Sequence, residues 1–87
     1  MSYKYVDQRP HLFTDDGQRL FLKIRDNVLR ILRNAGAVRM EEATAGFSGD
    51  SWDMLACVDR LVELKELREL KQDGYVAGQH RVFVAVS

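Results

Sequence analysis

Cysteine, proline and tryptophan are scarce in this sequence, and long apolar runs are absent. One cysteine in 87 residues excludes an internal disulfide framework and is typical of a reducing compartment. No apolar run is long enough to span a bilayer, and the first residues lack the apolar stretch of a secretory signal. We therefore expect a cytoplasmic protein that makes no contact with a membrane.

The chain also lacks a net charge, because 13 lysine and arginine residues balance 13 aspartate and glutamate residues. Non-specific affinity for nucleic acids depends on cationic groups that neutralise phosphates, so we expect that affinity to be low. Hydrophobic residues make up 46% of the chain and charged residues 30%, which is typical of one small globular domain. We expect an N-terminal arm over residues 1–13, followed by a folded domain over residues 14–87.

Motifs for catalysis or metal binding are missing as well. His11, Cys57 and His80 are far apart in the sequence and lack the close spacing of zinc ligands, and Cys57 is expected to be a small core residue. Glu41 and Glu42 are adjacent, so on a helix their side chains point about 100° apart and do not converge as a catalytic pair. Phosphate-binding glycine motifs are absent too. We therefore expect no enzymatic activity, no cofactor and no bound metal.

The sequence does contain the apolar periodicity of helices. Apolar residues recur at steps of three and four between residues 16 and 35, which predicts a first helix closed by Gly36. Met40 and Ala43 share one face of a short second helix near residues 39–45. A third helix near residues 51–65 begins at Asp50 or Ser51, and its apolar residues again follow a helical spacing.

The C-terminal residues instead predict a β-hairpin. Residues 81–86 are rich in valine and contain Phe83, which suits a strand, and Asp73-Gly74 before them is a strong turn signal. Since a lone strand cannot satisfy its backbone hydrogen bonds, we expect residues 67–71 to pair with it. Residues 1–13 contain the only proline, Pro10, and show no period, so we expect a loop or a short strand there.

Three stretches of the chain resemble the winged helix-turn-helix family. Residues 38–43 resemble its short strand and second helix, residues 61–70 the end of its third helix and the entry into the wing, and residues 76–83 the return side of the wing. The resemblance covers about residues 17–86 and implies an α+β, mainly helical fold of three helices with a C-terminal β-hairpin wing. The family commonly has glycine where its third helix ends. Lys65 at that point predicts a later end, and the turn over residues 46–50 is roomier than in a typical member.

The resemblance implies that the chain is a small DNA-binding transcriptional regulator of bacterial or phage type. In such proteins the third helix enters the major groove of double-stranded DNA and the wing lies against the backbone. The residues expected to contact DNA come from these two elements: Ser51, Arg60, Arg68, Lys71, Gln79, His80 and Arg81. For Arg81, an ordinary cross-strand pair with Glu69 is the alternative interpretation.

The charge on the outer face of the third helix argues against DNA binding. That face carries one cation against three carboxylates, which repel phosphates: Arg60 against Asp53, Asp59 and Glu63. The alternative is a protein-interaction module that does not bind DNA, with Trp52 as an aromatic anchor in an acidic rim. Trp52 has a second interpretation, in which its ring folds back over Phe47 and closes a corner of the core. The contact residues of the interaction module are expected to be Trp52, Asp53, Ala56 and Glu63.

The first helix carries a basic stripe beside two leucines. The stripe is interpreted either as a solvated outer face or as part of an interface, and it consists of Arg19, Lys23, Asp26, Arg30 and Arg33. Leu22 and Leu29 lie beside it, away from the core side, and need a cover. Either a second subunit packs there and forms a homodimer, or the cover comes from the arm residues Tyr3, Tyr5, Leu12 and Phe13.

Overall fold

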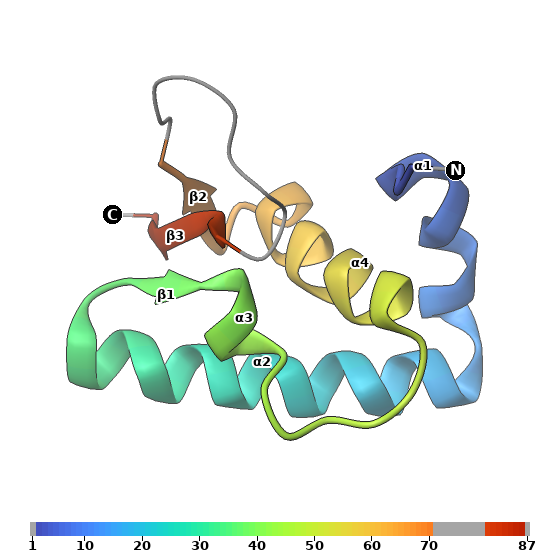
Figure 1. Ribbon diagram of the computed structural model, residues 1–87, viewed down its shortest axis with the longest axis horizontal. Helices are drawn as coiled ribbons and strands as arrows, with labels where there is room; N and C mark the ends of the chain where they lie inside the picture. Colours follow the sequence, from blue (N-terminus) through green and yellow to red (C-terminus); the bar gives the residue numbers. More distant parts are fainter. Residues whose placement is uncertain (1, 71–79, 87) are drawn as a thin grey trace.

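Helix α2 (Asp15–Ala35) is the longest element, and the other elements lie along one side of it (Figure 1). The computed structural model describes residues 2–70 and 80–86. The Thr14 hydroxyl caps α2 by accepting a hydrogen bond from the Gly17 N–H at 3.0 Å. Gly36 ends the helix in the left-handed conformation, with φ 80°. The predicted first helix is confirmed, and its buried face consists of Phe21, Ile24 and Val28.

Residues 5–13 are helical, which corrects the expected loop or short strand. Helix α1 (Tyr5–Gln8) leads directly into the 3₁₀ helix η1 (Arg9–Phe13), and Pro10 lies in the first turn of η1, where its fixed φ suits a helix start. The Leu12 side chain is buried in the core, and η1 lies against both α2 and helix α4 (Ser51–Glu63). Residues 3–13, called the N-terminal segment below, are therefore part of the packed fold.

The second and third predicted helices are both present where the sequence predicts them. They differ from each other in length. Helix α3 (Met40–Ala43) is one turn, whereas α4 has 13 residues. The Asp50 carboxylate caps α4 by accepting a hydrogen bond from the Trp52 N–H at 2.8 Å. Only α2 and α4 are long helices in the part of the chain that the structure describes.

The end of α4 corrects the later end that Lys65 predicted. Lys65 adopts the left-handed conformation that glycine favours, with φ 62°. Its N–H donates to the Val62 carbonyl at 3.0 Å, and the Glu66 N–H donates to the Leu61 carbonyl at 3.0 Å. These two hydrogen bonds satisfy the last carbonyls of the helix and turn the chain away from its axis.

Three short strands form an antiparallel sheet in the order β1-β3-β2. The edge strands are β1 (Val38–Arg39) and β2 (Leu67–Glu69), and the central strand is β3 (Val82–Ala85). Arg68 pairs with Val84, so the predicted pairing of the two C-terminal strands is confirmed. The predicted turn between them lies outside the described residues.

One core of buried side chains lies between α2, α4, the sheet and η1, and Figure 1 shows how these elements are arranged. Phe83 at the centre of the sheet is fully buried, and so is Cys57, as the sequence predicts. The chain is thus a mainly helical α+β domain with a small three-stranded antiparallel sheet. No helix among the described residues is both long and apolar enough to cross a bilayer.

Candidate interaction surface

The N-terminal segment covers the acidic outer face of α4. This face holds the three carboxylates singled out in the sequence, at spacings that bring them to one side of the helix. Each of them has a hydrogen-bond partner in the segment: His11 Nδ1 with Asp53 at 2.9 Å, Tyr3 with Asp59 at 2.6 Å and Tyr5 with Glu63 at 2.8 Å. Each carboxylate on this face of α4 therefore already has a hydrogen-bond partner within the protein.

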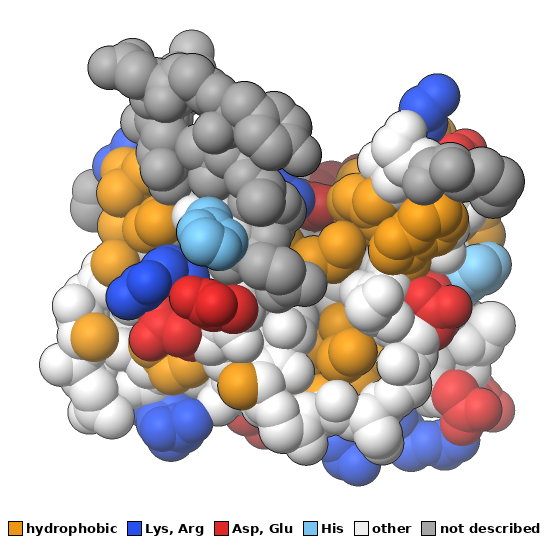
Figure 2. All heavy atoms as spheres, in the orientation of Figure 1, with side chains coloured by type: hydrophobic (Ala, Val, Ile, Leu, Met, Phe, Trp, Pro, Cys, Tyr) orange, Lys and Arg blue, Asp and Glu red, His pale blue; other side chains and the backbone are white. Residues whose placement is uncertain are grey.

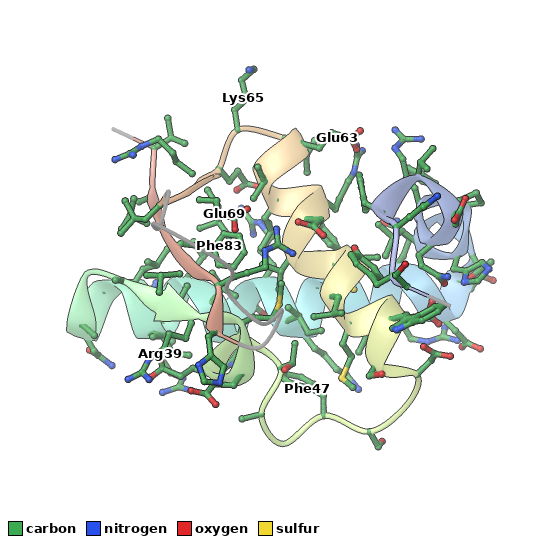
Figure 3. The ribbon with its side chains drawn as sticks, turned by 45° about the horizontal axis from the view of Figure 1, so that its top comes forward. Arg39, Phe47, Glu63, Lys65, Glu69 and Phe83 are labelled. Atoms are coloured by element: carbon green, nitrogen blue, oxygen red, sulfur yellow. The ribbon has the colours of Figure 1, made fainter. Side chains whose placement is uncertain are left out.

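Glu63 is the best-supported carboxylate on this face. It accepts hydrogen bonds from the Tyr5 hydroxyl, from Arg60 at 2.6 Å and from Arg9 at 3.0 Å, which together lower its pKa to about 2. Burial and the bond to Glu63 raise the pKa of Tyr5 to about 12. Both guanidinium groups also lie about 5 Å from the Phe13 ring centre, at 4.9 and 5.2 Å. Figure 3 shows Glu63 on the side of α4 that faces the N-terminal segment.

Arg81 is held between two carboxylates. It contacts Asp59 at 2.7 Å and Glu69 at 2.9 Å, so the predicted pair with Glu69 is present. The side chains of Arg81 and Asp59 are only 21% and 13% exposed. The bonds to Glu69 and Asp59 raise the pKa of Arg81, and burial together with the bond to Asp59 raises the pKa of Tyr3. The Arg81 side chain is thus largely buried and is bonded to carboxylates within the domain.

Trp52 and Ala56 lie under the N-terminal segment. Trp52 is half-buried, and its ring meets that of Tyr3 edge to face, with 6.4 Å between the centres. Ala56, expected on the outer face, is instead fully buried. The physical reason is that residues 3–13 add a second layer outside α4, so both sides of this helix are covered.

The residues predicted to contact DNA do not gather on one open surface. Arg60 and Arg81 are bound to carboxylates, as described above. Ser51 and Arg68 are exposed at opposite ends of the α4–β2 region, and Arg68 forms no ion pair with another described residue. His80 is exposed, while Lys71 and Gln79 lie outside the described residues.

The basic stripe of α2 faces away from the sheet, where Figure 2 shows lysine and arginine side chains along the edge of the molecule. Arg19 pairs with Asp16, and Arg30 hydrogen-bonds to Asn27 at 2.5 Å. Leu22 is 53% exposed, so the N-terminal segment does not cover it in the way the sequence suggested. A homodimer through Leu22 and Leu29 remains a prediction.

A hollow of about 410 Å³ lies between η1, the start of α2 and the loop before α4. It contains three carboxylates, but each is already engaged. Asp50 caps α4, Asp53 is bonded to His11, and Asp16 pairs with Arg19. Within residues 2–70 and 80–86 no group of histidine, cysteine and acidic side chains is arranged to hold a metal ion.

No protein-family model, curated protein or solved structure matches this chain. Function is therefore inferred from the geometry of the α4 face and of the sheet.

Proposed function

We propose that this chain is a winged-helix domain that binds a protein partner and does not use α4 to contact DNA. The order of α2, β1, α3, α4, β2 and β3 supports the winged-helix assignment, because it follows the helices, short strand and hairpin of that family. The proposed role is binding without catalysis.

The observation that carries this proposal is the cover over α4, which keeps this helix from DNA and also occupies the face on which Trp52 and Glu63 were expected to contact a partner. A helix that reads DNA inserts its outer side chains into the major groove. Here that side is occupied by the N-terminal segment, with Ala56 buried beneath it. The cations nearest to the face, Arg60 and Arg81, are bound to carboxylates and have no free charge for phosphates.

DNA binding through the hairpin is the second candidate. It is favoured by Arg68, which is exposed on β2 and has no ion pair with any described residue. Lys71 follows three residues later in the sequence. Two cations this close in the sequence suit contacts to phosphates that are independent of base sequence.

A titration with DNA separates the two candidates. Isotope-labelled protein is mixed with a mixed-sequence duplex at low salt, and the backbone amide shifts are followed. The proposal predicts no salt-dependent shifts in any part of the chain. Shifts confined to residues 68–81 that fade as salt rises would support DNA binding through the hairpin, and shifts that also include α4 would contradict the proposal directly.

A variant in which the N-terminal segment is held less tightly tests whether the segment covers a DNA-binding face of α4. Tyr3→Phe with Tyr5→Phe removes the two hydroxyl bonds to Asp59 and Glu63 and leaves the aromatic rings in place. We expect this variant to remain without DNA-dependent shifts, since the face beneath is acidic. New shifts in α4 only in the variant would show that the cover conceals a DNA-binding helix.

A further inference from the structure

The outer side of α2 is exposed along most of the helix. The buried residues Phe21, Ile24 and Val28 lie on the side toward α4 and the sheet, where the other elements are gathered (Figure 1). At about 100° per residue, the opposite side holds a row of leucines and a row of charged side chains. The members of these two rows are Leu22 and Leu29, and Arg19, Lys23, Asp26, Arg30 and Arg33. All of them are exposed except Leu29, which is half-buried.

The charged row has an excess of positive charge. Arg19 is already paired with a neighbouring carboxylate. Lys23, Arg30 and Arg33 form no ion pair within residues 2–70 and 80–86. Asp26 is the one carboxylate in the row, so three cations against it leave an excess of two positive charges. The charge that complements this side of α2 is therefore negative.

The leucines lie beside these cations at a matching interval. Leu22 and Leu29 are seven residues apart, which is two helical turns, or about 10.5 Å along the axis. Lys23 and Arg30 repeat the same interval one position later. Leu22 is 53% exposed, so its side chain is accessible to a partner. Apolar residues at an interval of seven, with charges along their flank, are the pattern by which one helix selects another of opposite charge.

We propose that the outer side of α2 binds an acidic amphipathic helix of a partner protein. This inference rests on the proposed function, and it gives the partner a surface other than the covered face of α4. The apolar residues of the partner recur every seven positions and pack against Leu22 and Leu29. Its carboxylates lie along the flank of these residues and pair with Lys23, Arg30 and Arg33.

Two other occupants fit this side less well. A second copy of the chain would bring the same excess of positive charge against it, which costs free energy. Double-stranded DNA would meet the Asp26 carboxylate among the cations and would leave Leu22 without an apolar contact. A helix that carries both carboxylates and apolar residues complements both rows.

The probe is a synthetic peptide with three copies of the heptad Gln-Ala-Leu-Gln-Ala-Glu-Glu, acetylated at its N-terminus and amidated at its C-terminus. Its leucines recur every seven residues, and the glutamates three and four positions after each leucine flank it on the helix surface. The peptide is titrated at low salt into the full chain, in which the leucine, valine and isoleucine methyl groups are isotope-labelled. The control peptide has lysine in place of each glutamate.

The methyl groups of α2 report which side of the helix is contacted. We expect the acidic peptide to shift the methyl signals of Leu22 and Leu29. Those of Ile24 and Val28 should stay in place, because both side chains are fully buried on the other side. The lysine peptide should leave all four residues unchanged.

Three variants separate the charge from the apolar contact. Lys23→Glu reverses one charge of the row and is expected to weaken binding of the acidic peptide about fivefold. Leu22→Gln removes apolar contact without a change of charge and should weaken it about threefold. Lys4→Glu is the matched control, since it makes the same change of charge at an exposed position outside α2 and should leave the affinity unchanged. All three residues are exposed, so the variants should keep the wild-type melting temperature.

Several outcomes would overturn this inference. They are equal binding of the acidic and basic peptides, equal effects of Lys23→Glu and Lys4→Glu, and no binding at millimolar acidic peptide. Shifts of the Leu22 and Leu29 methyl groups that grow with protein concentration, without peptide, would assign this side to a second copy. Salt-dependent shifts of α2 in the DNA titration would overturn this inference together with the proposed function. Failure with the peptide alone leaves the proposed function standing, since the DNA titration tests it separately.

Discussion

At the end of α4, Lys65 holds a backbone conformation that residues other than glycine rarely adopt, with φ 62°. For a residue with a side chain this conformation costs about 1 kcal/mol. The cost is offset by the hydrogen bonds that close the helix. The sharp turn also brings Glu66 into contact with Arg25, at 2.9 Å, and lets β2 begin at Leu67.

Replacing Lys65 with glycine should stabilise the protein. We expect Lys65→Gly to raise the free energy of unfolding by about 0.5–1 kcal/mol, because glycine adopts this conformation without a steric cost. Lys65→Ala, which keeps a Cβ atom, should stay within about 0.5 kcal/mol of wild type. Denaturation by urea measures both. A less stable glycine variant would mean that the lysine side chain contributes a contact that outweighs the strain.

Glu63 makes the docking of the N-terminal segment dependent on pH. Its pKa falls from the ordinary 4.5 to about 2 in the folded protein, so the folded state favours the ionised form. The stabilisation is therefore complete above pH 4.5 and is lost as the pH falls toward 2.

We expect Glu63→Gln to melt at a lower temperature than wild type at pH 7. This gap in melting temperature should close between about pH 5 and pH 2. Glu41→Gln is the control, since Glu41 is exposed on α3 and contacts Arg39 rather than the N-terminal segment. Thermal unfolding at a series of pH values measures the gap. A gap that persists unchanged at pH 2 would show that the charge of Glu63 is not what holds the segment.

At the level of elements, Gly17 determines how closely η1 approaches α2. A Cβ atom on Gly17 would overlap the backbone of His11 and Leu12. Glycine is therefore required by contact with the N-terminal segment, although it lies inside a helix, where alanine is ordinarily more stable.

The sign of the effect of Gly17→Ala tests this contact. At an open helical position the change stabilises by about 1 kcal/mol, whereas here we expect a loss of about 1–3 kcal/mol because η1 must move. Asn34→Ala, at the exposed end of the same helix, should change stability by no more than about 0.5 kcal/mol. Urea denaturation distinguishes the two outcomes, and a stabilised Gly17→Ala variant would mean that η1 is not held against α2.

The long helices could be predicted from the sequence, whereas the N-terminal segment could not. α2 and α4 span several turns, so the burial of one face leaves a clear period. α1 and η1 have four and five residues, which is too short for a period to appear. Their partners are also remote, since Tyr5 of α1 contacts Glu63 across 58 positions. Ala56 is buried because the N-terminal segment covers α4, and the sequence could not predict that cover.

For the molecule as a whole, equal numbers of positive and negative charges conceal an uneven distribution. Arg81 binds Asp59 of α4 and Glu69 of β2, Arg9 of the N-terminal segment binds Glu63 of α4, and Arg25 of α2 binds Glu66. Among the described residues, the lysines and arginines without an ion pair lie before α1, on α2, after α4 and on β2: Lys4, Lys23, Arg30, Arg33, Lys65 and Arg68. The sequence could identify the acidic face and the pair of Arg81 with Glu69. It could not show that the same Arg81 also binds Asp59, because that contact depends on how α4 packs against the sheet.

Asp59 ties two distant parts of the chain to one side chain of α4. It accepts a hydrogen bond from Tyr3 at 2.6 Å across 56 positions and one from Arg81 at 2.7 Å across 22 positions. Each contact closes a long loop, so its formation must offset a loss of chain entropy. A change at Asp59 is therefore transmitted to the N-terminal segment and to the start of the central strand together.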